Sequence, residues 1–168
     1  IDSFDDVYYS MNYALDACGF DRLSKDDIRQ LIGPDLKTSM TQKVNSPDFS
    51  YDVFIQHYRE YYIKSNTVYT TLYPDVAFVL KKLSEKGKQL AVLTNKSEDQ
   101  AKDILNKLGV GHFFTKIAGP DTYDSAKPDT TGINLLCRDL AVDKSAVIFV
   151  GDTEIDMLTA KGAECTSV

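Results

Sequence analysis

Short, largely apolar segments alternate with amphipathic segments from Tyr73 to the end of this 168-residue chain. Leu90–Leu93, Phe113–Ala118 and Ala146–Val150 have the composition of strands, and each is followed by polar residues and a further amphipathic stretch. Strands that are apolar on both faces must be covered on both faces, which is the arrangement of a parallel sheet between helices. The alternation therefore predicts an α/β fold for residues 74–168.

The first 70 residues follow a different period. Apolar side chains recur at steps of three and four from Val7 to Cys18, and a second stripe, rich in tyrosine, runs from Val53 to Tyr62. Gly19 stands where a helix is expected to end. Because no strand pattern interrupts this region, we predict a helical bundle over residues 4–73, with residues 1–3 belonging to the α/β part.

The charge balance excludes some classes of partner. There are 25 acidic and 19 basic residues, giving a net charge of −6, which argues against nucleic-acid binding and against a polybasic membrane-binding segment. No apolar run approaches the ~20 residues that cross a bilayer. The three cysteines, Cys18, Cys137 and Cys165, lack metal-binding spacing and are typical of reduced thiols in a cytoplasmic protein.

Ligands of parallel sheets bind beyond the carboxyl ends of the strands, so the polar residues that follow each strand are the candidate site. Thr94 and Asn95 follow the first strand and open a helix. A hydroxyl, an amide and the N–H groups of a helix N-terminus can together hold a phosphate group. The alternative is a plain helix cap, and the residues leave both interpretations open.

Two further groups follow the later strands. Lys127 precedes Pro128, which keeps it extended and lets its side chain project toward the sheet edge, where it could neutralise a phosphate. The alternative is a solvated loop lysine. Gly151 leads to Asp152 and Asp156, two carboxylates that face the same side of a helix and suit Mg²⁺. Their alternative is helix capping by acidic residues.

The order and spacing of these groups resemble the haloacid dehalogenase superfamily of phosphate-ester hydrolases. The resemblance rests on the phrases LAVLTNKS, AKPD and VIFVGDTEIDMLTAKGAE, and it runs the whole length of the chain. It implies a Rossmann-like parallel sheet with helices on both faces and makes residues 4–73 an inserted α-helical cap. The phrase IGPDL at residues 32–36, together with Thr94-Asn95-Lys96, is similar to the phosphoglycolate phosphatase branch.

The chain departs from the resemblance at the family's first motif, usually DxDGTxxDS. The opening IDSFDD corresponds to the continuation of that motif, so the nucleophilic and the acid/base aspartates would precede Ile1. Asp2, Asp5 and Asp6 fall beyond the loop and cannot replace them. In the family, this first motif follows a strand in the middle of the sheet. A sheet that lacks its middle strand has unpaired backbone groups on both sides of the gap, and burying such groups is costly. We therefore expect the chain to be a segment of a longer enzyme, truncated at both ends.

The resemblance implies a magnesium-dependent phosphatase that acts on a small phosphorylated metabolite through an aspartyl-phosphate, with phosphoglycolate as the first substrate to try. Asp152 would hold Mg²⁺, with Asp156 either as a second ligand or as a partner that orients the residues around the metal. Thr94 and Asn95 would bind the phosphoryl oxygens, and Lys127 would offset their charge.

The cap would close over the site and contact the leaving group. Lys43, Arg59 and the Ile32–Gly33 turn are the candidate contacts, although the aromatic stripe itself is more typical of cap core. Two other interpretations stay open. One is a sugar-phosphate mutase or nucleotide phosphatase of the same superfamily, and the other is a non-catalytic phosphate-binding relative. A monomer and a homodimer are both compatible with the sequence.

Overall fold

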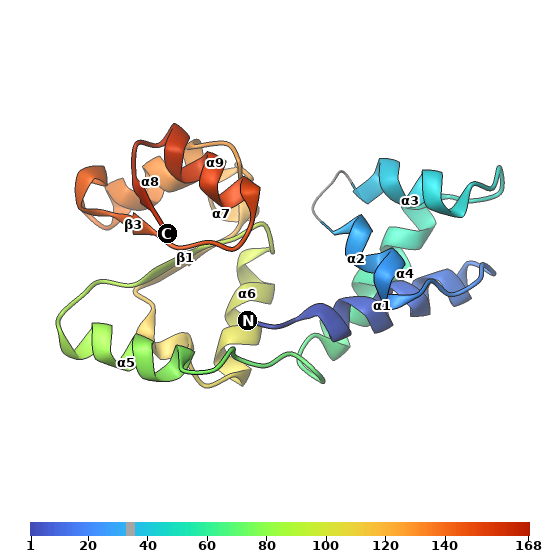
Figure 1. Cartoon of the computed structure of the whole chain (residues 1–168), viewed down its shortest axis with the longest axis horizontal. Helices are drawn as coiled ribbons and strands as arrows, with labels where there is room; N and C mark the ends of the chain where they lie inside the picture. Colours follow the sequence, from blue (N-terminus) through green and yellow to red (C-terminus); the bar gives the residue numbers. More distant parts are fainter. Residues whose placement is uncertain (33–35) are drawn as a thin grey trace. The chain divides into compact units, whose positions relative to one another are not determined.

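A computed structural model of the chain describes residues 1–32 and 36–168, so the predicted contact at Gly33 lies outside the described residues. The chain forms two compact units, Ile1–Tyr73 and Pro74–Val168 (Figure 1). Residues 1–3, predicted to belong to the α/β part, lie in the first unit. The reason is that Asp2 forms an antiparallel bridge with Thr71, through backbone hydrogen bonds of 2.9 and 3.0 Å.

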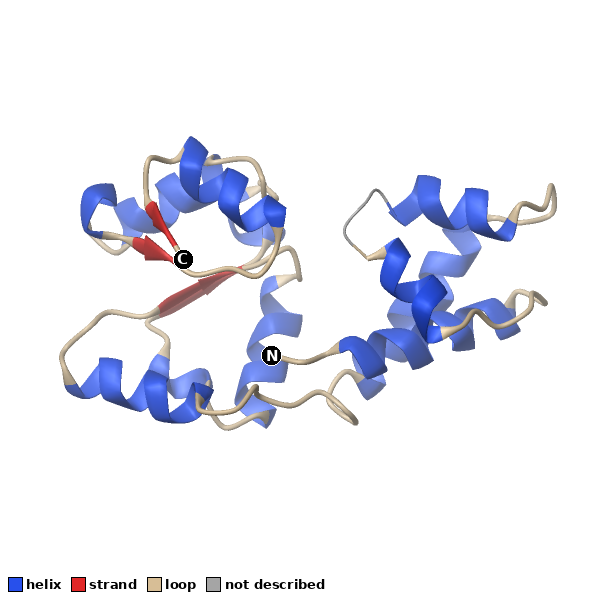
Figure 2. Ribbon diagram, viewed as in Figure 1, coloured by secondary structure: helices blue, strands red, loops and turns tan. Residues whose placement is uncertain are grey.

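The first unit is helical in its described residues, as Figure 2 shows. Its elements are α1 (Phe4–Ala17), α2 (Lys25–Leu31), α3 (Leu36–Val44) and α4 (Tyr51–Ser65). The predicted apolar periodicity is confirmed for α1, where Met11, Ala14 and Leu15 are buried. Gly19 follows this helix with a φ of +78°, a conformation that glycine adopts without strain.

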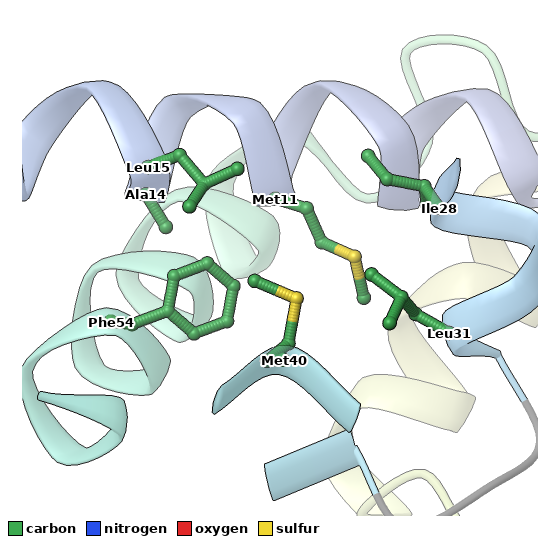
Figure 3. Packing of buried hydrophobic residues seen from close by; sticks show 7 residues of the cluster. All are labelled: Met11, Ala14, Leu15, Ile28, Leu31, Met40 and Phe54. Carbon is green, nitrogen blue, oxygen red and sulfur yellow. The ribbon is translucent and has the colours of Figure 1, made fainter. Parts of the chain in front are cut away.

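All four helices contribute to one core (Figure 3). In Figure 3, Leu15 of α1 and Met40 of α3 lie on the side of the cluster near Phe54 of α4, while Met11 of α1 extends toward Leu31 of α2. Phe54 is fully buried, and a side chain of this size stabilises the fold by roughly 3 kcal/mol through burial alone. The predicted stripe on α4 is only partly buried, because Val53 remains 47% exposed.

A buried carboxylate fixes the return of the chain to the start of α1. Asp6 is 2% exposed and accepts hydrogen bonds from the backbone N–H of Tyr69 and Thr70 and from the hydroxyl of Thr70. The shortest of these is 2.6 Å. One side chain therefore joins the segment after α4 to the first turn of α1.

We expect Asp6→Asn to lower the free energy of unfolding by about 1–3 kcal/mol, because an amide nitrogen would face N–H donors that then lose their acceptor. Asp5→Asn is the matched control. Asp5 makes an exposed ion pair with Lys25, so its loss should cost less than about 1 kcal/mol. Urea denaturation of both variants measures the difference, and equal losses would contradict the role given to Asp6.

The second unit alternates helices and strands. Its elements are α5 (Val76–Glu85), β1 (Ala91–Leu93), α6 (Glu98–Lys107), η1 (Gly111–Phe113), β2 (Lys116–Ala118), α7 (Pro120–Tyr123), α8 (Thr131–Asp139), η2 (Lys144–Ala146), β3 (Ile148–Phe149), α9 (Glu154–Gly162) and β4 (Thr166–Ser167). This is the predicted α/β order. None of the described helices in either unit is long and apolar enough to cross a bilayer.

The strands form two parallel pairs instead of one continuous sheet. β1 pairs with β2 and β3 pairs with β4, and within residues 1–32 and 36–168 no strand joins the two pairs. All three predicted strands are shorter than expected, and the first begins at Ala91 and not at Leu90. The segment predicted over 113–118 begins only at Lys116, and the one predicted over 146–150 is limited to Ile148 and Phe149.

The free edges explain this shortening, since a strand extends only as far as a neighbour pairs with it. Ile148 is 65% exposed and Val150 is 75% exposed, although their apolar character predicts cover on both faces. Leu93 of β1 and Phe149 of β3 nevertheless contact the same core cluster around Ile133 of α8. The two pairs therefore share one core.

Candidate active site

Three loops that follow strands meet in the second unit. The first contains Thr94 and Asn95 after β1, the second contains Lys127 after α7, and the third runs from Gly151 into α9 after β3. Asn95 hydrogen-bonds the Lys127 backbone, and the Lys127 side chain pairs with Asp156. The carboxyl ends of parallel strands thus bring together residues that are up to 61 positions apart, from Asn95 to Asp156.

The contact between Lys127 and Asp156 is the most buried ion pair among the described residues. Nζ of Lys127 lies 2.5 Å from Oδ1 of Asp156, and the two side chains are 15% and 7% exposed. The ammonium group also lies 5.9 Å from the centre of the Phe149 ring, which is within reach of a cation–π contact. This placement argues against the interpretation of Lys127 as a solvated loop lysine.

The second oxygen of Asp156 is engaged by Thr153, the N-cap of α9. Oδ2 accepts from the Thr153 hydroxyl at 2.6 Å and from its backbone N–H at 3.1 Å, while the Asp156 N–H faces the Thr153 hydroxyl. This is a capping box with aspartate at the third position. Helix capping, the alternative weighed for this carboxylate, is therefore present, and both oxygens of Asp156 are in use.

Burial acts to raise the pKa of Asp156, but the hydrogen bonds from Lys127 and Thr153 outweigh it. The pKa of Asp156 consequently lies below its ordinary value of 3.8, and the group is ionised at neutral pH.

Gly151 is required by the close approach of Asp156. A Cβ at this position would lie 2.2 Å from the Asp156 Cβ and 2.6 Å from its Cγ, which is closer than carbon atoms can come. Glycine is thus dictated by sterics against a named side chain. The loop after β3 can therefore pack closely against the first turn of α9 only because position 151 is glycine.

Asp152 differs from Asp156 in being exposed. Its carboxylate makes no hydrogen bond or ion pair with the part of the chain that the structure describes. It stands between Gly151 and Thr153, the two residues that contact Asp156. A free, hard oxygen donor at this point is the kind of ligand that Mg²⁺ takes.

The Thr94 hydroxyl accepts a hydrogen bond of 3.2 Å from the backbone of Lys96, and its backbone N–H pairs with Ala118 of β2. A hydroxyl that accepts one bond keeps its own hydrogen for an acceptor. The N-terminus of α6 is less open than the sequence predicts, because Asp121 accepts from the Glu98 N–H at 2.8 Å. Asp121 was not singled out in the sequence, and no local pattern points to it.

The two basic residues proposed to contact substrate belong to the helical unit. Lys43 forms an ion pair with Asp27, whose pKa falls to about 2 because of that pair and the hydrogen bonds from Ser24. Arg59 is exposed on α4. The charge of Lys43 is therefore already paired with that of Asp27.

Over residues 1–32 and 36–168, no group of three or more His, Cys, Asp or Glu side chains could hold a metal ion by itself. Mg²⁺ commonly takes only one or two carboxylates, with substrate phosphate and water as its other ligands. The donor set around Asp152 fits that pattern. It does not fit zinc, which takes three or four protein ligands.

Comparison with known proteins decides the family. The family model of haloacid dehalogenase-like hydrolases matches residues 1–168. The chain belongs to this family. A phosphoglycolate phosphatase of Aquifex aeolicus is 30% identical over 97% of this chain and 76% of its own length. One of Vibrio cholerae is 29% identical over 99% of this chain and 77% of its own.

Solved structures agree with this placement. A crystal structure described as a predicted phosphoglycolate phosphatase, from Haemophilus somnus, superimposes with a TM-score of 0.90 and 26% identity. The match covers 98% of this chain and 77% of the crystallised chain. A haloacid dehalogenase-like hydrolase of Bacteroides fragilis has the same fold, with a TM-score of 0.84. The chain is thus an enzyme of the phosphatase type in the phosphoglycolate phosphatase-like branch of the family.

The lowered pKa of Asp156 predicts how stability depends on pH. The ionised carboxylate contributes stability above pH 3.8, and this contribution is lost as the pH falls through the lower pKa of the folded state. We expect Asp156→Asn to reduce the free energy of unfolding at pH 7 by about 1–3 kcal/mol.

The deficit should shrink as the pH falls below 3.8, because only the wild type then loses the bond. Urea denaturation at several pH values measures it, with Glu154→Gln on the exposed first turn of α9 as the control. A deficit that is constant down to the lowest pH would contradict the assigned ionisation.

Proposed function

We propose that this chain acts in a magnesium-dependent phosphatase that hydrolyses a small phosphorylated metabolite, with phosphoglycolate as the first substrate to test. The observation that supports this most directly is the Lys127–Asp156 ion pair beside the free carboxylate of Asp152. Both curated relatives compared above are named phosphoglycolate phosphatases. A cytoplasmic location is part of the proposal, and the three free cysteines fit it.

In this proposal Lys127 and Thr94 bind the phosphoryl group. A phosphate monoester brings up to two negative charges, and the ammonium of Lys127 is held at the junction of the loops, where it can offset them. The Thr94 hydroxyl donates its free hydrogen to a phosphoryl oxygen. Placement and charge compensation supply most of the catalysis in reactions of this kind.

Asp152 is the residue to which we assign the metal. Asp156 instead holds Lys127 in place, because each of its oxygens already accepts a hydrogen bond. When bound, Mg²⁺ supplies further neutralisation of charge at the phosphoryl oxygens. Thr153 and Gly151 fix the turn that presents Asp152.

The nucleophile in this proposal is an aspartate that precedes Ile1. Its carboxylate attacks phosphorus and the bond to the leaving oxygen breaks, while the acid/base aspartate of the same motif gives that oxygen a proton. Water, deprotonated by the same aspartate, then attacks phosphorus, releases phosphate and regenerates the nucleophilic carboxylate. The free edges of β1 and β3 support this, since a parallel strand between them would pair with both. Such a strand would end at the same sheet edge as the three loops.

Residues 4–73, which make up nearly all of the helical unit, are proposed to act as a cap that excludes water and contacts the leaving group. Arg59 is the more suitable of its two candidate contacts, because Lys43 would first have to leave Asp27.

We expect Asp152→Asn to lower the magnesium-dependent hydrolysis of p-nitrophenyl phosphate by the full-length protein roughly 100-fold or more. Removing the charge weakens metal binding while the size of the side chain is kept. Glu154→Gln changes a neighbouring exposed carboxylate and should leave turnover unchanged. Turnover like that of the wild type in Asp152→Asn would remove Asp152 as the metal ligand.

Lys127→Ala should lower kcat by roughly 100-fold or more, since it removes the ammonium that pairs with Asp156 and offsets the charge of the phosphoryl group. Lys161→Ala, an exposed lysine near the end of α9, serves as the control. Steady-state kinetics are to be measured beside thermal unfolding. A loss of stability without a loss of turnover would favour a purely structural lysine.

A further inference from the structure

We propose that Asn95 is a positioning residue, which acts by clamping the backbone of Lys127 and so fixes the direction of its ammonium group. This rests on the proposed function in one respect, namely that Lys127 binds the phosphoryl group. It changes the role expected for Asn95 from its place after β1, which was to bind the phosphoryl oxygens itself.

The geometry of the contact carries the inference. Nδ2 of Asn95 donates to the Lys127 carbonyl at 3.0 Å, and Oδ1 accepts from the Lys127 N–H at 2.8 Å. A primary amide presents one donor and one acceptor side by side, so it matches both polar groups of a single residue. The contact joins positions 32 apart in the chain, which local turn formation cannot explain.

Both ends of the lysine are held as a result. The two bonded backbone groups flank the Cα of Lys127, and its Nζ is bound to Asp156 at 2.5 Å. A lysine side chain has four rotatable bonds, and ordering it costs up to about 2 kcal/mol of conformational entropy. Because Asn95 anchors the backbone and Asp156 anchors the ammonium, the side chain is already ordered in the folded protein. A ligand that binds Lys127 therefore does not have to order it.

The clamp also explains why the residue must be a neutral amide. An aspartate at position 95 would still accept from the Lys127 N–H, but its second oxygen would face the Lys127 carbonyl without a hydrogen between them. Alanine would remove both bonds. Asn95→Asp therefore removes one hydrogen bond and Asn95→Ala removes two. Because Asn95 is exposed, neither change disturbs the packing of the core.

The first measurement is independent of catalysis. Acetylation of Lys127 by acetic anhydride is followed by mass spectrometry of the Lys127 peptide in the wild type and the variants. We expect the rate to rise roughly fivefold or more in Asn95→Ala, and less in Asn95→Asp, because a freed ammonium spends more time away from Asp156. Asn134→Ala, at an exposed asparagine of α8, should react like the wild type.

The second measurement separates positioning from direct phosphate binding. For the full-length enzyme with p-nitrophenyl phosphate, a positioning role predicts a lower kcat with little change in KM for Asn95→Ala. It also predicts little further loss when Asn95→Ala is added to Lys127→Ala, since the two act through one group. A raised KM with unchanged kcat, or a full additional loss in the double variant, would overturn the inference.

The two measurements keep the inference and the proposed function apart. If the wild type lacks phosphatase activity, the proposed function fails, and the acetylation rates still decide whether Asn95 holds Lys127. If Asn95→Ala and Asn95→Asp both leave the acetylation rate of Lys127 unchanged, the clamp does not position the lysine, whatever the activity.

Discussion

The ion pair between Lys127 and Asp156 is the interaction on which the candidate site depends. Burying either charge alone would be costly, so each is retained because the other is present. Three neighbouring residues act on this pair. Asn95 holds the backbone of the lysine, Thr153 holds the second oxygen of the carboxylate, and Gly151 leaves room for it.

The pair also gives the site a defined charge. Lys127 and Asp156 neutralise one another, which leaves Asp152 as the free carboxylate of this turn. In the proposed function, a phosphate group would compete with Asp156 for the ammonium of Lys127. Such an exchange needs no rearrangement of the backbone, because the backbone is held by separate hydrogen bonds.

How far the sequence predicts this structure depends on the range of the interactions. The periodicity around Met11 and the stop at Gly19 are local, and both are present as predicted. The convergence of Asn95, Lys127 and Asp156 follows from one general rule, that parallel strands end at a common edge.

What the sequence did not provide is the choice of partner. The side-chain amide of Asn95 can bind either a phosphate or the backbone of another residue. Only the conformation of the loop around Lys127, 32 residues away, brings a backbone partner within reach. Thr153 and Asp156 have the spacing of a capping box, and Ser24 and Asp27 form another capping box at the start of α2, so this contact of Asp156 could be predicted from the sequence. The extent of β3 was not predictable from its composition, since pairing and not apolarity sets the length of a strand.

The bridge between Asp2 and Thr71, strengthened by Asp6, has a consequence for how such proteins diversify. The chain enters and leaves the helical unit through neighbouring residues, so the two ends of that unit are about one strand spacing apart. A segment bounded in this way can be excised, shortened or exchanged for another without stretching the polypeptide that remains. Recombination can therefore replace the helical unit while the backbone of residues 74–168 stays unchanged.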